Sequence, residues 1–379
     1  FPGALGESGL RFTTTAKVKN FDPVGNAAQR LASGAIVSSD SSAQFGIVAA
    51  RQAAEESGVV RHHDPAAIAI VTGCACGGRA ADEDANRHLY TRNARVPPTA
   101  ILRTMASSGA SSIAIELGIT GPVLNISTAC ASGTHAIGLA FQMVRSGMAA
   151  AAIAGGYEAP LTFGFLRAWD SMRVVSPTSC RPFSADRDGM TLGEGAAMLA
   201  LEPMDAAVAR GARIYAEIVG FGMSADAHHI TQPRAEGAAL AMTRALEDAA
   251  SSGVQDAASR IGYINAHGTG TTTNDAVEAA AIHQSLGSLA VRVPVGATKS
   301  LTGHSIGAAG AIEALATVLA LGERRLPHTA GITQVDAALH LDVITGEARA
   351  MEPERDIALS NSLAFGGLNA VLAFRRLDG

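Results

Sequence analysis

The sequence predicts an α/β fold built from two similar halves. Short apolar runs, typical of buried strands, alternate along the chain with longer segments whose apolar residues recur at helical spacing. This alternation favours largely parallel sheets covered by helices. Each half also carries reactive side chains where predicted strands end, and no linker or low-complexity tract separates the halves. We therefore expect a duplicated, layered α-β-α-β-α structure, with halves over residues 1–215 and 216–379 that pack as one unit.

Composition excludes several classes of protein. Apolar residues make up 47% of the chain and aromatic residues only 4%, so the core should consist of alanine, valine, isoleucine and leucine. The net charge of −5 argues against nucleic-acid binding, which needs a basic domain. No run of about 18 apolar residues is evident, so no membrane span is expected.

The four cysteines indicate a reducing, cytoplasmic environment. They are few and unevenly spaced in a long chain, unlike a disulfide framework. Cys74 and Cys76 have no second pair of cysteine or histidine residues at zinc spacing, so no metal site is expected.

Periodicity predicts the elements of the first half. Residues 1–20 indicate a loop with one short strand. Ser41–Ser57 should be a helix with Phe45 and Val48 on its inner face, and Gly58 ends it. The only tryptophan, Trp169, is more typical of a core or interface anchor than of a catalytic group. Further segments are expected as strands (67–73, 149–156 and the end of 190–201), as an exposed helix or loop (80–94) and as a helix of small residues (104–117).

The second half repeats the alternation of strands and helices. Strands are expected over residues 214–222, 261–266, 291–298, 357–363 and 368–377, and helices over 236–251, 275–286 and 306–322. Asp275 and Glu278 are placed in the first turn of their helix, where negative charge is favourable. The helix over residues 306–322 is apolar throughout, so we expect it at the centre of the protein.

One cysteine stands where a strand becomes a helix. Residues 123–140 begin as a short apolar run and continue with apolar residues at helical spacing, and Cys130 lies at the junction. A thiol there would point into the crevice at the carboxyl end of the sheet. The N-terminus of the helix would favour its thiolate. Cys130 is therefore a candidate nucleophile.

Three further segments are predicted to be site loops, because each follows a strand. Residues 267–273 offer a histidine with several hydroxyls, residues 299–304 a lysine with a second histidine, and residues 361–369 a glycine-rich corner with one aromatic ring. A cysteine, two histidines and a lysine at strand ends suit covalent acyl chemistry. Phosphate-binding motifs do not fit, since residues 296–300 lack the P-loop glycine and residues 305–310 are not G-x-G-x-x-G.

The chain resembles the β-ketoacyl-acyl-carrier-protein synthases, the condensing enzymes of fatty-acid and polyketide synthesis with the thiolase-like fold. The resemblance runs in family order from about residue 10 to Leu377, and together its motifs are highly specific. The Cys-His-His set is similar to the elongating type, not to the Cys-His-Asn type that starts chains from coenzyme A thioesters. The matching motifs are Thr128-Ala129-Cys130, Arg187-Asp188-Gly189 with Gly193-Glu194-Gly195, His267-Gly268-Thr269-Gly270-Thr271, residues 299–310, and Asn361-Ser362 with Phe365-Gly366-Gly367.

The resemblance implies catalytic roles. Cys130 would take the acyl group from an acyl-carrier-protein thioester, with the backbone N–H groups of Cys130 and Phe365 as the oxyanion hole. His267 and His304, both neutral, would donate hydrogen bonds to the malonyl thioester carbonyl and stabilise the enolate formed as CO₂ leaves. Attack of the enolate on acyl-Cys130 would give a 3-ketoacyl product.

The resemblance also implies supporting roles. Lys299 would supply positive potential and orient His304, and Glu313 would be its partner. Thr269 and Thr271 would bind the phosphopantetheine arm, and Phe365 would be a gate between the acyl pocket and the malonyl site. No metal or redox cofactor is required, because the thioester arm comes with the carrier protein.

The partners implied are acyl carrier protein, acyl and malonyl thioesters, and a second subunit. We expect a homodimer that uses residues 97–110, and a heterodimer with an inactive partner stays open.

The chain departs from the family pattern in three places. Leu363 and Leu368 stand where an aromatic residue and a threonine are common, so acyl-chain preference should differ. Only Arg30 is basic just ahead of the helix at Ser41, where an acidic carrier would dock. The family's opening strand is missing before Phe1, and we expect the sequence rather than the fold to be incomplete.

Besides chain elongation in fatty-acid or polyene and polyketide synthesis, two other functions stay open. A coenzyme A-dependent thiolase or acyltransferase would need a second cysteine in the last glycine corner. No cysteine follows Cys180, which weakens this alternative. A non-catalytic chain-length partner subunit would typically lack the nucleophile, and Cys130 is present.

Overall fold

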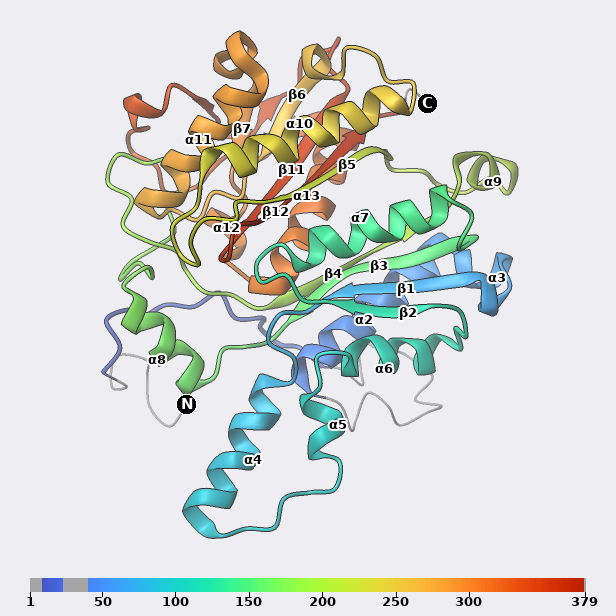
Figure 1. Cartoon of the computed structure of the whole chain (residues 1–379), viewed down its shortest axis with the longest axis vertical. Helices are drawn as coiled ribbons and strands as arrows, with labels where there is room; N and C mark the ends of the chain where they lie inside the picture. The colour runs from blue at the N-terminus through green and yellow to red at the C-terminus, as the bar shows by residue number, and fades with distance from the viewer. Residues whose placement is uncertain (1–8, 23–39, 378–379) are drawn as a thin grey trace.

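Two β-sheets form the frame of the protein, with helices outside and between them (Figure 1). The computed structural model describes residues 9–22 and 40–377. The first sheet has the strand order β2-β1-β3-β4 and the second β5-β12-β11-β6-β7-β9. The strands are β1 Ile68–Gly73, β2 Val123–Ile126, β3 Ala151–Glu158, β4 Gly195–Leu201, β5 Glu217–Ala225, β6 Ile261–Asn265, β7 Pro294–Gly296, β9 Asp342–Val343, β11 Ile357–Ala364 and β12 Leu368–Arg375, beside a separate pair of β8 Arg325–Leu326 and β10 Arg349–Ala350.

The same pairing pattern recurs in the two sheets. Strands β2, β1 and β3 are parallel, and β4 runs antiparallel to β3. Strands β7, β6 and β11 are likewise parallel, and β12 runs antiparallel to β11. The outer edge of β12 pairs with β5, whereas the outer edge of β4 has no partner strand among the described residues.

Helices occupy three layers, which confirms the predicted α-β-α-β-α arrangement. Helices α2 and α6 cover the outer face of the first sheet, α10 and α11 cover the outer face of the second, and α7 and α13 lie between the sheets (Figure 1). The helices are α2 Ser41–Ser57, α3 Val59–His62, α4 Arg79–Arg92, α5 Ala100–Thr104, α6 Ser108–Leu117, α7 Ser132–Arg145, α8 Phe163–Met172, α9 Met204–Ala209, α10 Ala235–Ser251, α11 Thr272–Leu286, α12 Lys299–Thr302 and α13 Ala309–Glu323.

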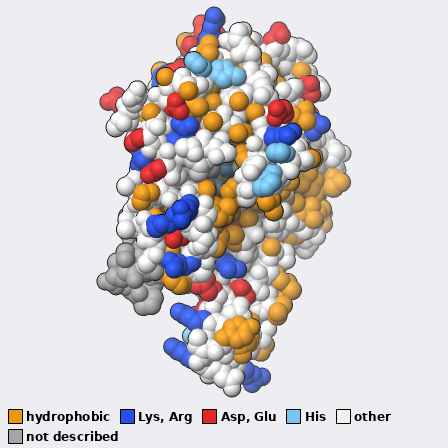
Figure 2. Space-filling model, turned by 60° about the vertical axis from the view of Figure 1, so that its left-hand side comes forward, with side chains coloured by type: hydrophobic (Ala, Val, Ile, Leu, Met, Phe, Trp, Pro, Cys, Tyr) orange, Lys and Arg blue, Asp and Glu red, His pale blue; other side chains and the backbone are white. Residues whose placement is uncertain are grey.

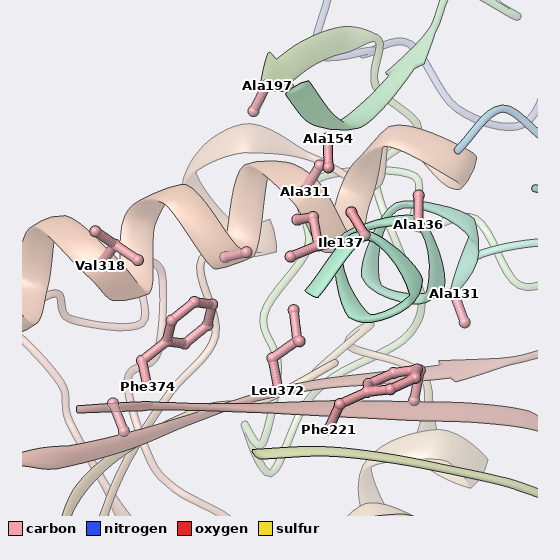
Figure 3. Packing of buried hydrophobic residues seen from close by; sticks show 14 of the residues in the cluster. Ala131, Ala136, Ile137, Ala154, Ala197, Phe221, Ala311, Val318, Leu372 and Phe374 are labelled. Atoms are coloured by element: carbon pink, nitrogen blue, oxygen red, sulfur yellow. The ribbon is translucent and has the colours of Figure 1, made fainter. Parts of the chain in front are cut away.

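Small residues let the two central helices pack closely. Figure 3 shows Phe221, Leu372 and Phe374 of the second sheet pointing toward these helices, with Ala154 and Ala197 of the first sheet on the opposite side. Because α7 follows β2 and α13 follows β7 and α12, the N-termini of both central helices arise at corresponding ends of the two sheets. The layered packing therefore brings the residues that precede these helices together.

One described helix is long and apolar enough to cross a membrane by composition. Over Ile306–Glu323 the mean hydropathy is 1.5, so the expectation that no such run exists is wrong. However, 67% of this segment is buried, because α13 lies between the two sheets. Its apolar surface therefore faces the protein core, at the central position that the sequence predicts.

Several predicted elements differ locally from the structure. The strand expected over residues 291–298 spans only Pro294–Gly296, because Gly287–Arg292 form a 3-10 helix. The expected helix over residues 104–117 is interrupted between α5 and α6, where the backbone of Gly77 and Gly78 packs against residues 103–106. Residues 9–22 contain no strand, only an isolated bridge from Ala16 to Gly193. Strand β5 extends to Ala225 because it pairs with β12 as far as Leu368. Phe1 and Arg30 lie outside the described residues.

Candidate active site

Cys130 lies on a sharp turn between β2 and α7. Ala129, just before it, has a φ of 48°, in the left-handed region that non-glycine residues rarely adopt. Ser132 closes the turn, since its Oγ donates to the Ala129 carbonyl at 2.7 Å and accepts the Thr128 N–H at 2.9 Å. The turn therefore holds the Cys130 thiol, which is buried, just ahead of α7.

Two histidines from the second half of the chain lie beside this thiol. His304 Nε2 is 3.1 Å from Cys130 Sγ. The His267 ring lies edge-on to the His304 ring, with centroids 5.4 Å apart. One ligand-type atom from each of the three residues lies within 4.8 Å of the others. The structure thus brings together three residues that lie far apart in the sequence.

Hydrogen bonds place the proton of both imidazoles on Nε2. The Ile306 N–H donates to His304 Nδ1 at 3.3 Å, and Lys299 Nζ donates to His267 Nδ1 at 3.1 Å. Each Nδ1 is therefore an acceptor, which leaves Nε2–H as the donor of a neutral ring.

Both histidines are neutral at pH 7, as the family resemblance implies. Burial lowers the pKa of His267 and of His304 well below the ordinary value, and the charge of Lys299 lowers the pKa of both further. The site therefore offers two neutral N–H donors beside a thiol.

Lys299 contacts His267 rather than His304. Its Nζ donates to the His267 carbonyl at 2.7 Å and pairs with Glu313, which confirms the expected partner. The expectation that Lys299 orients His304 is wrong, because the hydrogen bonds of the ammonium group go to His267 and Glu313. Burial raises the pKa of Glu313 to about 7, although the Lys299 charge opposes this shift.

The resting Cys130 is a thiol. Burial raises its pKa to about 11, and the charge of Lys299 and the Phe365 N–H, which both lower it, do not outweigh burial. Burial therefore outweighs the predicted preference of the helix N-terminus for the thiolate in the resting protein. The thiol has to lose its proton during any reaction in which it acts as a nucleophile.

Phe365 borders Cys130 through its backbone and Trp169 through its ring. The Phe365 N–H hydrogen-bonds to Cys130. The Phe365 ring stacks on Trp169 of α8, with centroids 5.8 Å apart and planes 20° apart. Gly366 and Gly367 follow with φ values of 85° and 70°, which glycine adopts readily.

Comparison with known proteins identifies the family. The beta-ketoacyl synthase N-terminal domain matches residues 10–207, and the beta-ketoacyl synthase C-terminal domain matches residues 215–333. The chain belongs to the β-ketoacyl synthase family. The resemblance seen in its motifs is thereby confirmed.

Similar proteins include bacterial relatives and a solved ketosynthase structure. The chain is 40% identical to nodulation protein E of Rhizobium meliloti over 343 residues, which covers 90% of this chain and 84% of the relative. It is 40% identical to 3-oxoacyl-[acyl-carrier-protein] synthase 2 of Vibrio cholerae over 345 residues, 88% of this chain and 82% of the relative. The ishigamide ketosynthase/chain length factor structure is similar with a TM-score of 0.89 and 32% identity, over 98% of this chain and 89% of that chain.

Two hydroxyls of this β-ketoacyl synthase lie between β6 and α11. Thr269 Oγ1 and Thr271 Oγ1 are 2.9 Å apart. Thr271 also caps α11, since its hydroxyl accepts the Asn274 N–H at 3.3 Å. Thr271 thus has a structural partner already, and the binding of a phosphopantetheine arm by this pair stays a prediction.

Buried carboxylates that were not predicted as site residues hold the loops of the site. Glu278 accepts the N–H groups of His267 and Gly268, each at 2.8 Å. Asp275 accepts the Gly270 N–H at 3.2 Å. Only Asp275 lies in the first turn of α11, so the predicted placement of Glu278 there is wrong. Both carboxylates are fully buried and anchor the loop after β6. Two acids just after a histidine- and glycine-rich loop were the available sequence signal.

A third buried carboxylate, Glu158 at the end of β3, holds the loop on the other side. It accepts the N–H groups of Ala75, Cys76 and Gly307 at 2.8, 3.1 and 3.1 Å. Gly307 belongs to the turn between His304 and α13, so Glu158 ties the first sheet to the histidine loop. No local sequence pattern indicates this role.

Proposed function

We propose that this β-ketoacyl synthase joins an acyl group on Cys130 to malonyl-acyl carrier protein by decarboxylative Claisen condensation, giving 3-ketoacyl-acyl carrier protein. The observation that carries the proposal is the buried trio of Cys130, His267 and His304, with both imidazole protons on Nε2. The cysteine supplies a covalent acyl carrier, and the two neutral donors supply electrostatic stabilisation for an enolate oxygen. The name of the Vibrio cholerae relative supports this reaction.

Acyl transfer is the first half-reaction. Cys130 Sγ attacks the thioester carbonyl, and the N–H groups of Cys130 and Phe365 donate to the oxygen that becomes negative. The bond from carbon to the sulfur of the carrier arm then breaks, and the thiol proton leaves on that sulfur. Because the pKa of Cys130 is about 11, the proton is lost as the new S–C bond forms.

Decarboxylation and condensation follow. The malonyl thioester oxygen accepts hydrogen bonds from His267 and His304. The bond to the carboxylate breaks, CO₂ leaves, and the electron pair stays in the enolate. The enolate carbon attacks the acyl carbonyl on Cys130, a C–C bond forms, and the Cys130 thiolate leaves and takes up a proton. Lys299, held by Glu313, adds positive potential beneath His267.

We assign the carrier arm and the gate to residues around this trio. Thr269 and Thr271 bind the phosphopantetheine arm, which is part of the substrate. Phe365 is the gate between the acyl pocket and the malonyl site. The site lies between the two halves, residues 1–215 and 216–379. The four cysteines are free, which supports a reducing cytoplasm as the place of action.

We also propose a dimer as the working form. Helices α4 and α5 project from the body (Figure 1), and Figure 2 shows hydrophobic side chains gathered on this projection. Ile101, Leu102 and Met105, within the predicted interface over residues 97–110, are exposed. The similar ishigamide structure holds a ketosynthase and a chain length factor, so a heterodimer is the alternative arrangement.

Two variants test the proposed reaction. Cys130→Gln should abolish condensation, because no acyl group can be held, while CO₂ release from malonyl-acyl carrier protein persists or rises. His304→Ala should abolish CO₂ release while Cys130 still accepts an acyl group. Product analysis, CO₂ release and the mass of the acylated protein measure these steps. Unchanged condensation by Cys130→Gln would refute the proposal, whereas thiolysis of 3-ketoacyl-coenzyme A by the unmodified protein would favour a thiolase.

A further inference from the structure

We infer that Trp169 is a positioning residue for acyl transfer: by stacking on the Phe365 ring, it holds the Phe365 N–H against the Cys130 thiol. This inference rests on the proposed function of Phe365 in the oxyanion hole. It assigns to the single tryptophan a role at the site, where the sequence indicated only a core or interface anchor.

Helix α8, which carries Trp169, is anchored away from the glycine corner. The Gly164 N–H donates to both carboxylate oxygens of Glu83 on α4, each at 3.1 Å. Asp170 accepts a hydrogen bond from Arg11 Nε at 3.0 Å. Leu166 is fully buried in a cluster with residues of the first described segment. These contacts make α8 a fixed support that does not depend on Phe365.

The corner that carries Phe365 is short and rich in glycine. Only three residues join β11 to β12, and two of them are glycines with positive φ. The Gly366 N–H donates to the Ile230 carbonyl at 2.8 Å and the Gly367 carbonyl accepts the Asp226 N–H at 2.9 Å, which hold the corner from one side. On the other side the ring of Phe365 rests on Trp169. Since glycine permits several backbone conformations, the ring stack is what selects the one that aims the Phe365 N–H at Cys130.

A row of three aromatic rings joins the support to the corner. Phe165 lies one turn before Trp169 on α8, and their ring centroids are 5.9 Å apart. Trp169 then stacks on Phe365 in a nearly parallel arrangement, at a distance typical of favourable aromatic pairs. Through this stack, the fixed position of α8 determines where the backbone N–H of Phe365 lies beside the Cys130 thiol.

The two half-reactions separate this role from a general effect on folding. Acyl transfer uses the Phe365 N–H, whereas decarboxylation uses His267 and His304. Trp169→Leu is therefore expected to slow acylation of Cys130 about two- to tenfold, the range that loss of one aromatic pair implies. Decarboxylation, measured in the Cys130→Gln background, should not change. Trp169→Phe keeps a ring and should restore most of the acylation rate.

Fluorescence gives a second readout. Trp169 is the only tryptophan of the chain, so its emission reports the stack without background. Phe365→Leu should change the emission of the resting protein. Loading Cys130 from octanoyl-pantetheine, a donor without tryptophan, should change the emission of the unmodified protein but not that of Cys130→Ala.

The controls distinguish the inference from the proposed function. Phe163→Leu alters an exposed ring on the same helix and should leave both half-reactions unchanged. The inference is overturned if Trp169→Leu acylates at the normal rate or faster, if both half-reactions fall equally, or if Phe365→Leu leaves the emission unaltered. An unmodified protein that neither acylates Cys130 nor releases CO₂ would overturn the proposed function itself.

Discussion

Burial, more than neighbouring charge, decides the protonation of each reactive residue. Burial raises the pKa of Cys130 to about 11 although Lys299 and the Phe365 N–H act in the opposite direction. The same burial lowers the pKa of His267 and His304, and here the Lys299 charge acts in the same direction. The resting site is therefore a neutral thiol beside two neutral imidazoles.

Alkylation of Cys130 by iodoacetamide should reflect its raised pKa. Only the thiolate reacts, and its fraction rises about tenfold per pH unit below the pKa. Because that pKa is about 11, the rate should still be rising between pH 7 and pH 9. Mass spectrometry of the Cys130 peptide measures the rate, and Cys130→Ser gives the background from the other cysteines. A plateau near pH 8 would contradict the raised pKa.

At the scale of elements, the contact between α7 and α13 sets the geometry of the site. Thr134 on α7 and Ser362 on β11 share a hydrogen bond of 2.7 Å beside Gly310 of α13. A Cβ at Gly310 would lie 2.0 Å from Thr134 Oγ1 and 2.8 Å from Ser362 Oγ. Only glycine therefore allows this approach of the helix that follows His304 to the helix that follows Cys130.

Gly310→Ala should lower the free energy of unfolding by about 1–3 kcal/mol, because the added methyl group overpacks this contact. Gly322→Ala is the matched control on the same helix. Its Cβ would meet no atom within 4 Å, so the better helix propensity of alanine should raise stability by up to about 1 kcal/mol. Urea unfolding of both variants measures the difference, and equal stabilities would argue against the close contact.

At the scale of the whole molecule, the exposed apolar arm predicts self-association. Ile101 and Leu102 of α5 are 65% and 64% exposed. Strand β2 pairs only with β1 among the described strands, so the first sheet also presents a free edge. An exposed apolar surface and an unpaired strand edge are both unfavourable in a single subunit, and both favour association.

Replacing Ile101 and Leu102 by glutamate should convert a dimer into a monomer, because two charges would be buried in the interface. Val208→Glu, at a residue that is 62% exposed on α9 outside the arm, should remain dimeric. Light scattering on the purified chains distinguishes the two masses. A clean monomer before any substitution would count against the proposed dimer.

Local patterns account for what was predictable from the sequence. Helix α2 has the predicted bounds, because Asp40 and Gly58 cap it from within the same stretch of chain. The positions of Cys130, His267, Lys299 and His304 at strand ends follow from the alternation of strands and helices. The break between α5 and α6 was not predictable, because distant glycines at residues 77 and 78 pack there.

The sequence by itself determined the layered α/β fold, the family and the set of reactive residues, since periodicity, turn glycines and short motifs are local properties of the chain. Only the tertiary structure decided the state and the partners of those residues. Lys299 supports His267, Cys130 rests as a thiol, Glu278 and Glu158 hold the loops, and Trp169 reaches Phe365. Burial and contacts between distant segments arise only when the two sheets close over α7 and α13, and no local pattern encodes them.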